Sequence, residues 1–139
     1  APVLAAARLD ASPALAVGVG LAAIAGHNWS IFLHGKGGKG IATSYGVLLG
    51  LSPLAGLIAA GLWISIVVVT RYASLASLAG VLSVPLVMLL TREPVEHLVF
   101  GVVAAGVAVY RHRANIQRLV QGEELPIVPR RRRPPSADA

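Results

Sequence analysis

Long apolar runs, divided by short breaks that carry proline, serine or arginine, constrain the fold of this chain more than any other feature of its sequence. With 55% hydrophobic and 13% charged residues and a mean hydropathy of +0.72, the chain is far more apolar than a soluble domain of its length. We therefore expect an all-α, polytopic membrane protein with about five complete transmembrane helices. They are expected over residues 14–25, 41–51, 54–69, 72–90 and 95–110.

The starts of two of these helices are marked by a serine followed directly by proline, at Ser12–Pro13 and Ser52–Pro53. Serine caps the free N–H groups of a first turn, and proline suits the first helical position. Residues 1–9 are apolar but too few to cross a bilayer core, which needs about 20 residues. They are expected to be a partial helix.

The helix expected over residues 14–25 ends at Gly26, where the most polar stretch of the chain begins. This stretch, GHNWSIFLHGKGGKGIATS (residues 26–44), combines close backbone approach at its glycines with positive charge at its lysines. Because a helix is expected to begin at Ile41, its first N–H groups would face the same point. The stretch predicts an anion site, with phosphate as the expected ligand, formed by Gly35, Lys36, Gly37, Gly38, Lys39 and Gly40.

This pattern differs from the P-loop of nucleotide hydrolases, which requires Lys and then Ser or Thr directly after its second glycine. Here Gly40 is followed by Ile41 and Ala42, so no hydroxyl stands where a magnesium ion would need it. A second interpretation stays open. The stretch would then be a flexible loop between two membrane helices, with lysines present because cytoplasmic loops favour them.

A second polar cluster, TRYASLAS, covers residues 70–77. Arg71 at the start of a helix can bind phosphate through two parallel hydrogen bonds, or it can extend to lipid head groups. Ser74 and Ser77 are three residues apart and share a helix face, where they would bind a ligand or pack against a neighbouring helix.

A third polar cluster, YRHRANIQRLVQGEE, covers residues 110–124. On a helix, His112, Asn115 and Leu119 would share a face, with Arg111 and Arg118 on another. The alternative is a basic amphipathic segment that lies on the lipid surface.

The net charge of +6 arises from basic residues in short clusters between apolar runs, which favours anionic lipids and phosphorylated substrates over nucleic acid as partners. Arginines at 111, 113, 118 and 130–133 place the C-terminus in the cytoplasm. Counting crossings backwards from there brings all three polar clusters to the cytoplasmic face. Residues 1–126 are expected to be a transmembrane domain, and residues 127–139 a disordered basic tail.

The sequences GHNWSIFL, KGGKGIATS, TRYASLAS and HRANIQRLVQGEE, in this order and spacing, resemble the membrane-integral acyl-phosphate:glycerol-3-phosphate acyltransferases, the PlsY family. The resemblance extends from Ala1 to about Pro126. It implies a seven-helix membrane fold, of which this chain would supply helices two to seven, with a site on the cytoplasmic face of the bacterial plasma membrane. The implied reaction transfers a fatty acyl group from acyl phosphate to the 1-position of sn-glycerol 3-phosphate. A soluble enzyme that makes acyl phosphate is a further implied partner.

The resemblance also carries over functional residues by motif. His112 and Asn115 match the family's important histidine and asparagine and are expected to be catalytic, and Glu124 matches its structural glutamate. Gly35 stands where the family commonly has an aromatic residue. The family's first motif, with its essential serine and arginine, would precede Ala1, so the chain is expected to be N-terminally truncated. The expected substrate-binding residues are His27, Lys36, Gly37, Gly38, Lys39, Gly40, Arg71 and Ser74.

The chemistry expected from the residues agrees with such a donor. No His-x4-Asp pair is present, because the residues five after the four histidines are Phe32, Lys39, Val102 and Gln117. An acyl phosphate carries its own leaving group, so proximity and electrostatics suffice, and no cofactor or metal is expected. The proton of the attacking hydroxyl would go to His112 or to the donor's phosphate. The rival function is a transporter or channel subunit for a phosphorylated solute, although the chain has no inverted repeat.

Overall fold

The computed structural model describes residues 12–29 and 39–127, which form helices and connecting turns without any strand. The expected all-α fold is therefore confirmed for these residues. The expected partial helix at residues 1–9 lies outside the described residues, as does the tail beyond residue 127. The helices are α2 (Pro13–Asn28), α3 (Ile41–Leu51), α4 (Pro53–Thr70), α5 (Ala73–Leu90), α6 (Val95–Arg111) and α7 (Arg113–Gln121).

The two Ser–Pro pairs begin helices as predicted. The Ser12 hydroxyl accepts a hydrogen bond from the Leu15 N–H at 3.3 Å, and Ser52 accepts one from the Ala55 N–H at 3.4 Å. The predicted end of the first helix at Gly26 is wrong, because α2 continues to Asn28. A glycine inside a helix costs only about 1 kcal/mol, so the backbone ladder can continue through it.

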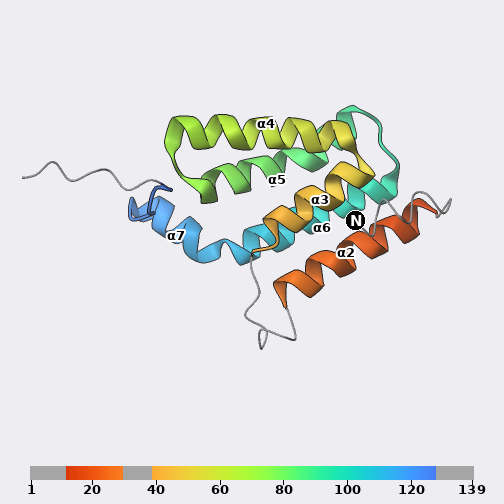
Figure 1. Cartoon of the computed structure of the whole chain (residues 1–139), viewed down its shortest axis with the longest axis horizontal. Helices are drawn as coiled ribbons and strands as arrows, with labels where there is room; N and C mark the ends of the chain where they lie inside the picture. The colour runs from red at the N-terminus through yellow and green to blue at the C-terminus, as the bar shows by residue number, and fades with distance from the viewer. Residues whose placement is uncertain (1–11, 30–38, 128–139) are drawn as a thin grey trace, which may run out of the picture.

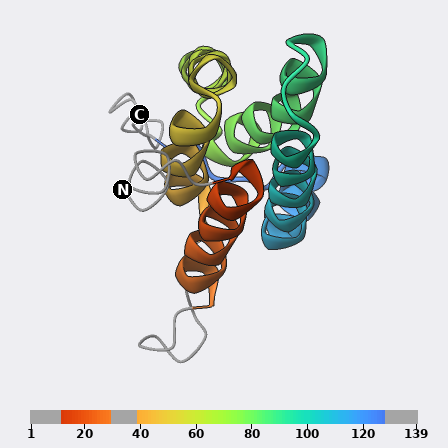
Figure 2. The same ribbon diagram turned by 90° about the vertical axis from the view of Figure 1, so that its right-hand side faces the viewer.

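Helices α2 to α6 run alternately up and down, so that successive turns lie at opposite ends of a bundle (Figures 1 and 2). The core between them is built from Phe100 and Met88, both almost fully buried, and from small residues that let helices approach closely. Gly101 is one such residue, because a Cβ there would lie 3.2 Å from the Met88 sulfur.

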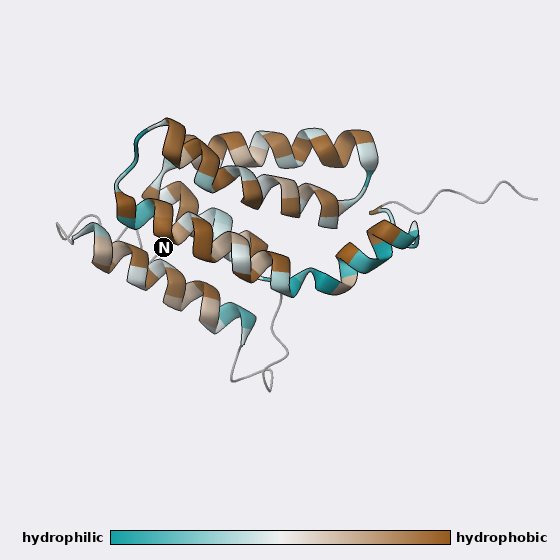
Figure 3. Ribbon diagram, turned by 180° about the vertical axis from the view of Figure 1, so that it is seen from behind, coloured by the Kyte–Doolittle hydropathy of each residue, from teal (hydrophilic) through white to brown (hydrophobic). Residues whose placement is uncertain are grey.

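The outward surface of α4 and α5 is apolar, as Figure 3 shows by colour. Val68 and Val69 in α4 are 72% and 82% exposed. Among the described residues, α4 and α5 are long and apolar enough to cross a membrane, with 18 residues and a mean hydropathy of 2.1 each. Helix α3 has 11 residues and rises only about 16 Å, half of a bilayer core. The expected count of five complete crossings is therefore not confirmed.

The third polar cluster lies mostly on a separate short helix, beyond the end of the helix that was expected over residues 95–110. Helix α6 ends at Arg111, and α7 begins at Arg113 after a break at His112. The break follows from tertiary packing, because the His112 ring is 2% exposed and its Nδ1 bonds the Ala108 carbonyl oxygen at 2.8 Å. His112 and Asn115 still turn to the same side, since both are buried.

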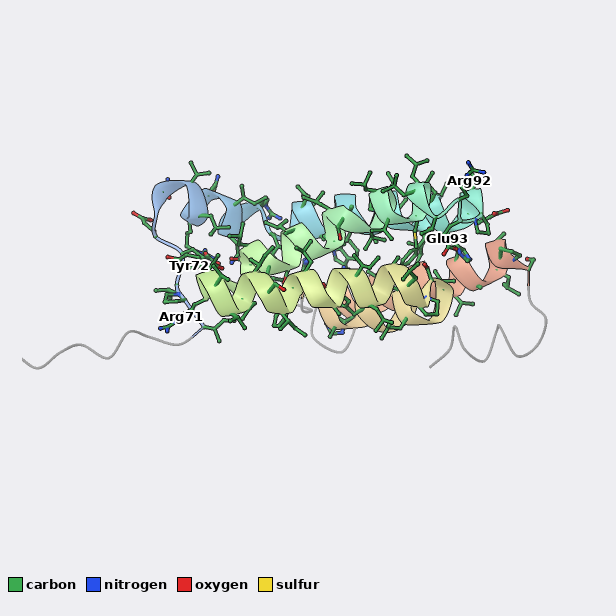
Figure 4. All side chains as sticks on the ribbon, turned by 90° about the horizontal axis from the view of Figure 1, so that it is seen from above. Arg71, Tyr72, Arg92 and Glu93 are labelled. Carbon is green, nitrogen blue, oxygen red and sulfur yellow. The ribbon has the colours of Figure 1, made fainter. Side chains whose placement is uncertain are left out.

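The two ends of the bundle differ in the residues that they gather. In Figure 4, Arg71 and Tyr72 lie at one end, and Arg92 and Glu93 lie at the other. The second and third polar clusters meet at the Arg71 end, where the Ile127 N–H donates to the Arg71 carbonyl oxygen at 2.8 Å. The predicted convergence of polar clusters at one end is thus confirmed for the described residues.

Candidate functional site

A cavity of about 380 Å³ opens at the Arg71 end of the bundle. Residues from four helices and from the segments beside them line it, although they lie far apart in the sequence. The cavity is mostly polar on its walls, and it brings together a lysine, two histidines, an asparagine and a glutamate. The lining residues are His27, Lys39, Gly40, Ile41, Ala42, Ala73, Ser74, Ser77, His112, Asn115, Glu124 and Leu125.

Glu124 holds one wall of this cavity together. Its Oε1 accepts hydrogen bonds from Ser74 Oγ at 2.5 Å and from Asn115 Nδ2 at 2.6 Å, and its Oε2 accepts one from Arg118 Nε at 2.8 Å. Gly122, with φ of 72°, turns the chain after α7 so that Glu124 can reach back. Burial raises the pKa of Glu124, but the hydrogen bonds and the Arg118 charge outweigh burial and lower this pKa to about 2.

Asn115 links Glu124 to Lys39 through two hydrogen bonds of its side-chain amide. Its Oδ1 accepts a hydrogen bond from Lys39 Nζ at 2.7 Å, while its Nδ2 is engaged by Glu124. The two bonds fix which way the amide points, because a carboxylate only accepts and an ammonium only donates. The ammonium of Lys39 has two further donors, which are available to an anion in the cavity.

His112 lies in the cavity wall as a neutral base. Because the Ala108 carbonyl oxygen can only accept, the His112 Nδ1 must carry a proton, which leaves Nε2 as the acceptor of the neutral ring. Burial lowers the pKa of His112, the bond to Ala108 and the charge of Glu124 raise it, and the positive charge of Lys39 lowers it. The net effect is a pKa below the ordinary 6.5, so the ring is neutral at pH 7 and able to take up a proton.

The N-terminus of α3 faces the same cavity through Gly40, Ile41 and Ala42. Gly40 precedes the helix with φ of 74°, and no side chain caps the first turn. The free N–H groups of that turn favour an anion. Glycine is required at position 40, since its φ is left-handed and a Cβ there would lie 2.5 Å from Asn28 Oδ1.

The structure brings together seven of the site residues expected from the sequence. Arg71 is not among them: it ends α4 with φ of 64° and does not line the cavity. Its left-handed backbone and its carbonyl bond to Ile127 hold the chain reversal between α4 and α5. Lys36, Gly37 and Gly38 lie outside the described residues. The residues that meet at the cavity are His27, Lys39, Gly40, Ser74, His112, Asn115 and Glu124.

Sequence reasoning missed two neighbours of the site. Asn28, directly after His27, is fully buried, and neither polar atom of its side chain has a hydrogen-bond partner. Trp63 donates from Nε1 to Ser77 Oγ at 3.1 Å and so joins α4 to the cavity wall. A signal existed for Asn28, since it is a polar residue placed at the end of an apolar run. Nothing in the sequence around Trp63 indicates its partner.

An apolar groove of about 360 Å³ adjoins the polar cavity. Ile41 and Ala42 line both, so the two spaces adjoin at the first turn of α3. The polar cavity can therefore hold a charged group while an attached apolar chain lies in the groove. The other residues of the groove are Tyr45, Ala60, Trp63 and Ile64.

Comparison with known proteins gives a consistent result. A family model described as glycerol-3-phosphate acyltransferase matches residues 1–122. The glycerol-3-phosphate acyltransferase of Desulforudis audaxviator is 51% identical over 112 residues, which are 81% of this chain and 57% of that protein. The one from Desulforamulus reducens is 44% identical over 125 residues, which are 90% and 62% of the two chains.

Two crystal structures of PlsY (YgiH), an integral membrane glycerol 3-phosphate acyltransferase, are also similar, each with 36% identity and a TM-score of 0.86. One is the glycerol 3-phosphate form and the other the lysophosphatidic acid form. Each match covers 91% of this chain, and 64% and 65% of the respective PlsY chains. The present chain thus spans less than two thirds of the length of these relatives.

Proposed function

The chain belongs to the glycerol-3-phosphate acyltransferase family, and we propose that it forms most of a membrane enzyme that transfers a fatty acyl group from acyl phosphate to the 1-position of sn-glycerol 3-phosphate. The products are 1-acyl-sn-glycerol 3-phosphate and phosphate. The observation that carries the proposal is the cavity itself, where Lys39, the uncapped start of α3, Asn115 and His112 meet. The comparisons give no support to a transporter or channel.

The phosphate of glycerol 3-phosphate is assigned to Lys39 and the start of α3. Lys39 is held by Asn115 with two donors to spare, and the first-turn N–H groups beside Gly40 have no side-chain cap. His27 and Ser74 complete this wall of the cavity. Lys36, Gly37 and Gly38 are assigned to the same phosphate on their place in the glycine-rich stretch.

His112 and Asn115 are assigned to the reacting groups. The substrate hydroxyl oxygen forms a bond to the acyl carbonyl carbon, and the bond from that carbon to the phosphate oxygen of the donor breaks. His112 Nε2 takes the hydroxyl proton, which its neutral state at pH 7 allows. The donor supplies its own leaving group, because inorganic phosphate departs with the electrons of the broken bond. No covalent intermediate is needed, and the acyl chain of the donor lies in the apolar groove beyond Ala42.

The cavity end is assigned to the cytoplasmic side of a bacterial plasma membrane. This end carries Arg71, Arg111, Arg113 and Arg118, as the excess of basic residues on the cytoplasmic side requires. A soluble enzyme that makes acyl phosphate would deliver its product to the same face. Because the chain has no cysteine, single cysteines at Gln121 and Glu93 test the orientation, and they are expected to label from the cytoplasmic and the outer side respectively.

The deciding experiment follows the full-length protein reconstituted in vesicles with acyl phosphate and labelled glycerol 3-phosphate. Formation of labelled 1-acylglycerol 3-phosphate is expected, and acyl-CoA in place of acyl phosphate is expected to give none. Uptake of labelled glycerol 3-phosphate into the vesicles without its acylation would overturn the proposal in favour of transport.

A further inference from the structure

Asn28 is the one described residue whose buried side-chain polar atoms lack any hydrogen-bond partner. Its exposure is 0%, and both Oδ1 and Nδ2 are unpaired. Nearly all buried side-chain polar groups in proteins are paired, because an unpaired one has lost its hydrogen bonds to water without replacement. An apolar residue of similar size, such as leucine, would avoid this loss. The amide at position 28 therefore needs an explanation other than packing.

The position of Asn28 supplies that explanation. It is the last residue of α2, directly after the cavity residue His27, and its Oδ1 lies against Gly40 at the start of α3. Gly40 follows Lys39 and has the left-handed backbone that turns the chain into α3. The amide thus lies behind the turn that presents both the lysine and the first N–H groups of α3 to the cavity. Asn28 does not itself line the cavity.

We propose that Asn28 is a positioning residue for the anion site, whose amide bonds the backbone of the Lys39–Gly40 turn when a phosphate occupies the cavity. A bound anion draws the first N–H groups of α3 towards itself, and the turn behind them shifts with the helix start. An amide can both donate and accept, so it can pair with whichever backbone group the shift presents. The inference rests on the proposed function, because the phosphate in question is that of glycerol 3-phosphate.

The test compares Asn28→Leu with Asn28→Ala in the full-length protein. Leucine keeps the branched shape and the number of heavy atoms of asparagine and removes the polar atoms, so Asn28→Leu should raise Tm or leave it unchanged. It should also raise KM for glycerol 3-phosphate about tenfold, the value of one hydrogen bond, with a much smaller change in kcat. Alanine removes volume and polar atoms together, so Asn28→Ala should raise KM similarly while Tm falls.

Thermal stabilisation by added glycerol 3-phosphate gives a second readout that does not need turnover, since a ligand that binds the folded state raises Tm by an amount set by the ratio of its concentration to Kd. Asn28→Leu should need about tenfold more ligand for the same rise in Tm, matching the loss of one hydrogen bond. An unchanged KM and an unchanged ligand dependence in this variant would overturn the inference and leave the proposed function intact. A fall in Tm would also overturn it, because the amide would then already be paired in the unliganded protein. A wild-type protein with neither turnover nor stabilisation would instead overturn the proposed function.

Discussion

Each end of the bundle holds a carboxylate in a cluster of hydrogen bonds. The two clusters differ in whether their last member lies at the cavity. At one end, Glu93 accepts bonds from Ser52 Oγ at 2.8 Å and from His97 Nδ1 at 2.9 Å, which joins the turn after α3 to the turn after α5. At the other end, Glu124 orders Asn115, and Asn115 orders Lys39 at the cavity.

The two clusters also differ in whether they contain a charge that has no partner of opposite charge. The Glu93 carboxylate is matched by the His97 ring and the Ser52 hydroxyl, so that cluster is complete without a ligand. Within residues 12–29 and 39–127, Lys39 has no carboxylate partner, and its charge faces the cavity beside an uncapped helix start. Similar residue types therefore support stability at one end and, in the proposed function, ligand binding at the other. The hydrogen-bond and charge partners of each residue distinguish the two roles, and residue type alone does not.

The largest effect is expected from removing polar groups at the cavity. His112→Ala and Asn115→Ala should each lower kcat about 100-fold or more, because a base or an orienting amide beside the reacting hydroxyl is lost. His112→Ala should change KM for glycerol 3-phosphate less, since His112 is not assigned to its phosphate, whereas Asn115→Ala should also raise KM because Asn115 holds Lys39. Steady-state kinetics of the full-length protein measure both constants. A rise in KM with kcat unchanged would assign these residues to binding instead.

A second large effect should appear in the pH profile of kcat/KM. Because the pKa of His112 is lowered from 6.5, the ring takes up a proton only below that pH, and the rate should fall on the acid side there. The profile should be flat between pH 6.5 and 8 as far as His112 is concerned. The substrate phosphate also titrates near pH 6, so His112→Ala is the control: its residual rate should lack the part of the acid limb due to the ring. An enzyme with the same acid limb after this substitution would exclude His112 as the base.

A smaller effect separates the two carboxylates. Glu124→Gln keeps the shape of the side chain but loses the charge that pairs with Arg118. The amide of glutamine can also donate, so it no longer fixes which way the Asn115 amide points. We expect kcat to fall about tenfold, the loss of one charged hydrogen bond. Glu93→Gln is the matched change at the other end and should leave kcat unaltered. Equal losses of kcat in the two variants would show that the ends act together and would contradict the comparison.

Acid stability should be altered by both of these variants. The pKa of Glu124 is lowered from 4.5 to about 2. Burial raises the pKa of Glu93, but its bonds to His97 and Ser52 and the His97 charge lower it below 4.5 overall. A lowered carboxylate pKa stabilises the fold above the unfolded value and loses this effect as pH falls through the folded one. Both Gln variants should therefore show a weaker dependence of Tm on pH between 4.5 and 2 than the wild type.

Sequence reasoning succeeded where the cause is local. Ser12 and Ser52 start helices because cap and proline act within one turn, and alternation of apolar runs placed Ser74 and Asn115 at the same end. The end of α6 near residue 110 was also expected, whereas the burial of His112 at the break depends on the folded bundle.

Sequence reasoning could not place Arg71 or Asn28 in the folded protein. Arg71 was expected to bind phosphate or to extend to lipid head groups; its left-handed backbone puts it in a turn, and it does not line the cavity. Asn28 has no partner that a motif could indicate, because its significance is the absence of one. The bond between Ser52 and Glu93 joins residues 41 apart, and only the folded bundle brings them together.

The smallest effect on activity is expected from Ser52→Ala, which tests the closed end by itself. Ser52 is 1% exposed and has two roles, as the cap of α4 and as the donor to Glu93.

Ser12→Ala is the matched control, because Ser12 also caps a helix before a proline but is exposed, and the structure gives its hydroxyl no bond beyond the cap. Losing the cap should cost each variant about 1 kcal/mol. Ser52→Ala should lose up to about 1 kcal/mol more, because the partly buried Glu93 carboxylate loses a donor. Tm should therefore fall further for Ser52→Ala than for Ser12→Ala, while kcat and KM of both stay at the wild-type values. A Ser52→Ala variant with normal Tm and reduced kcat would instead mean that the Glu93 cluster acts on the cavity through the bundle.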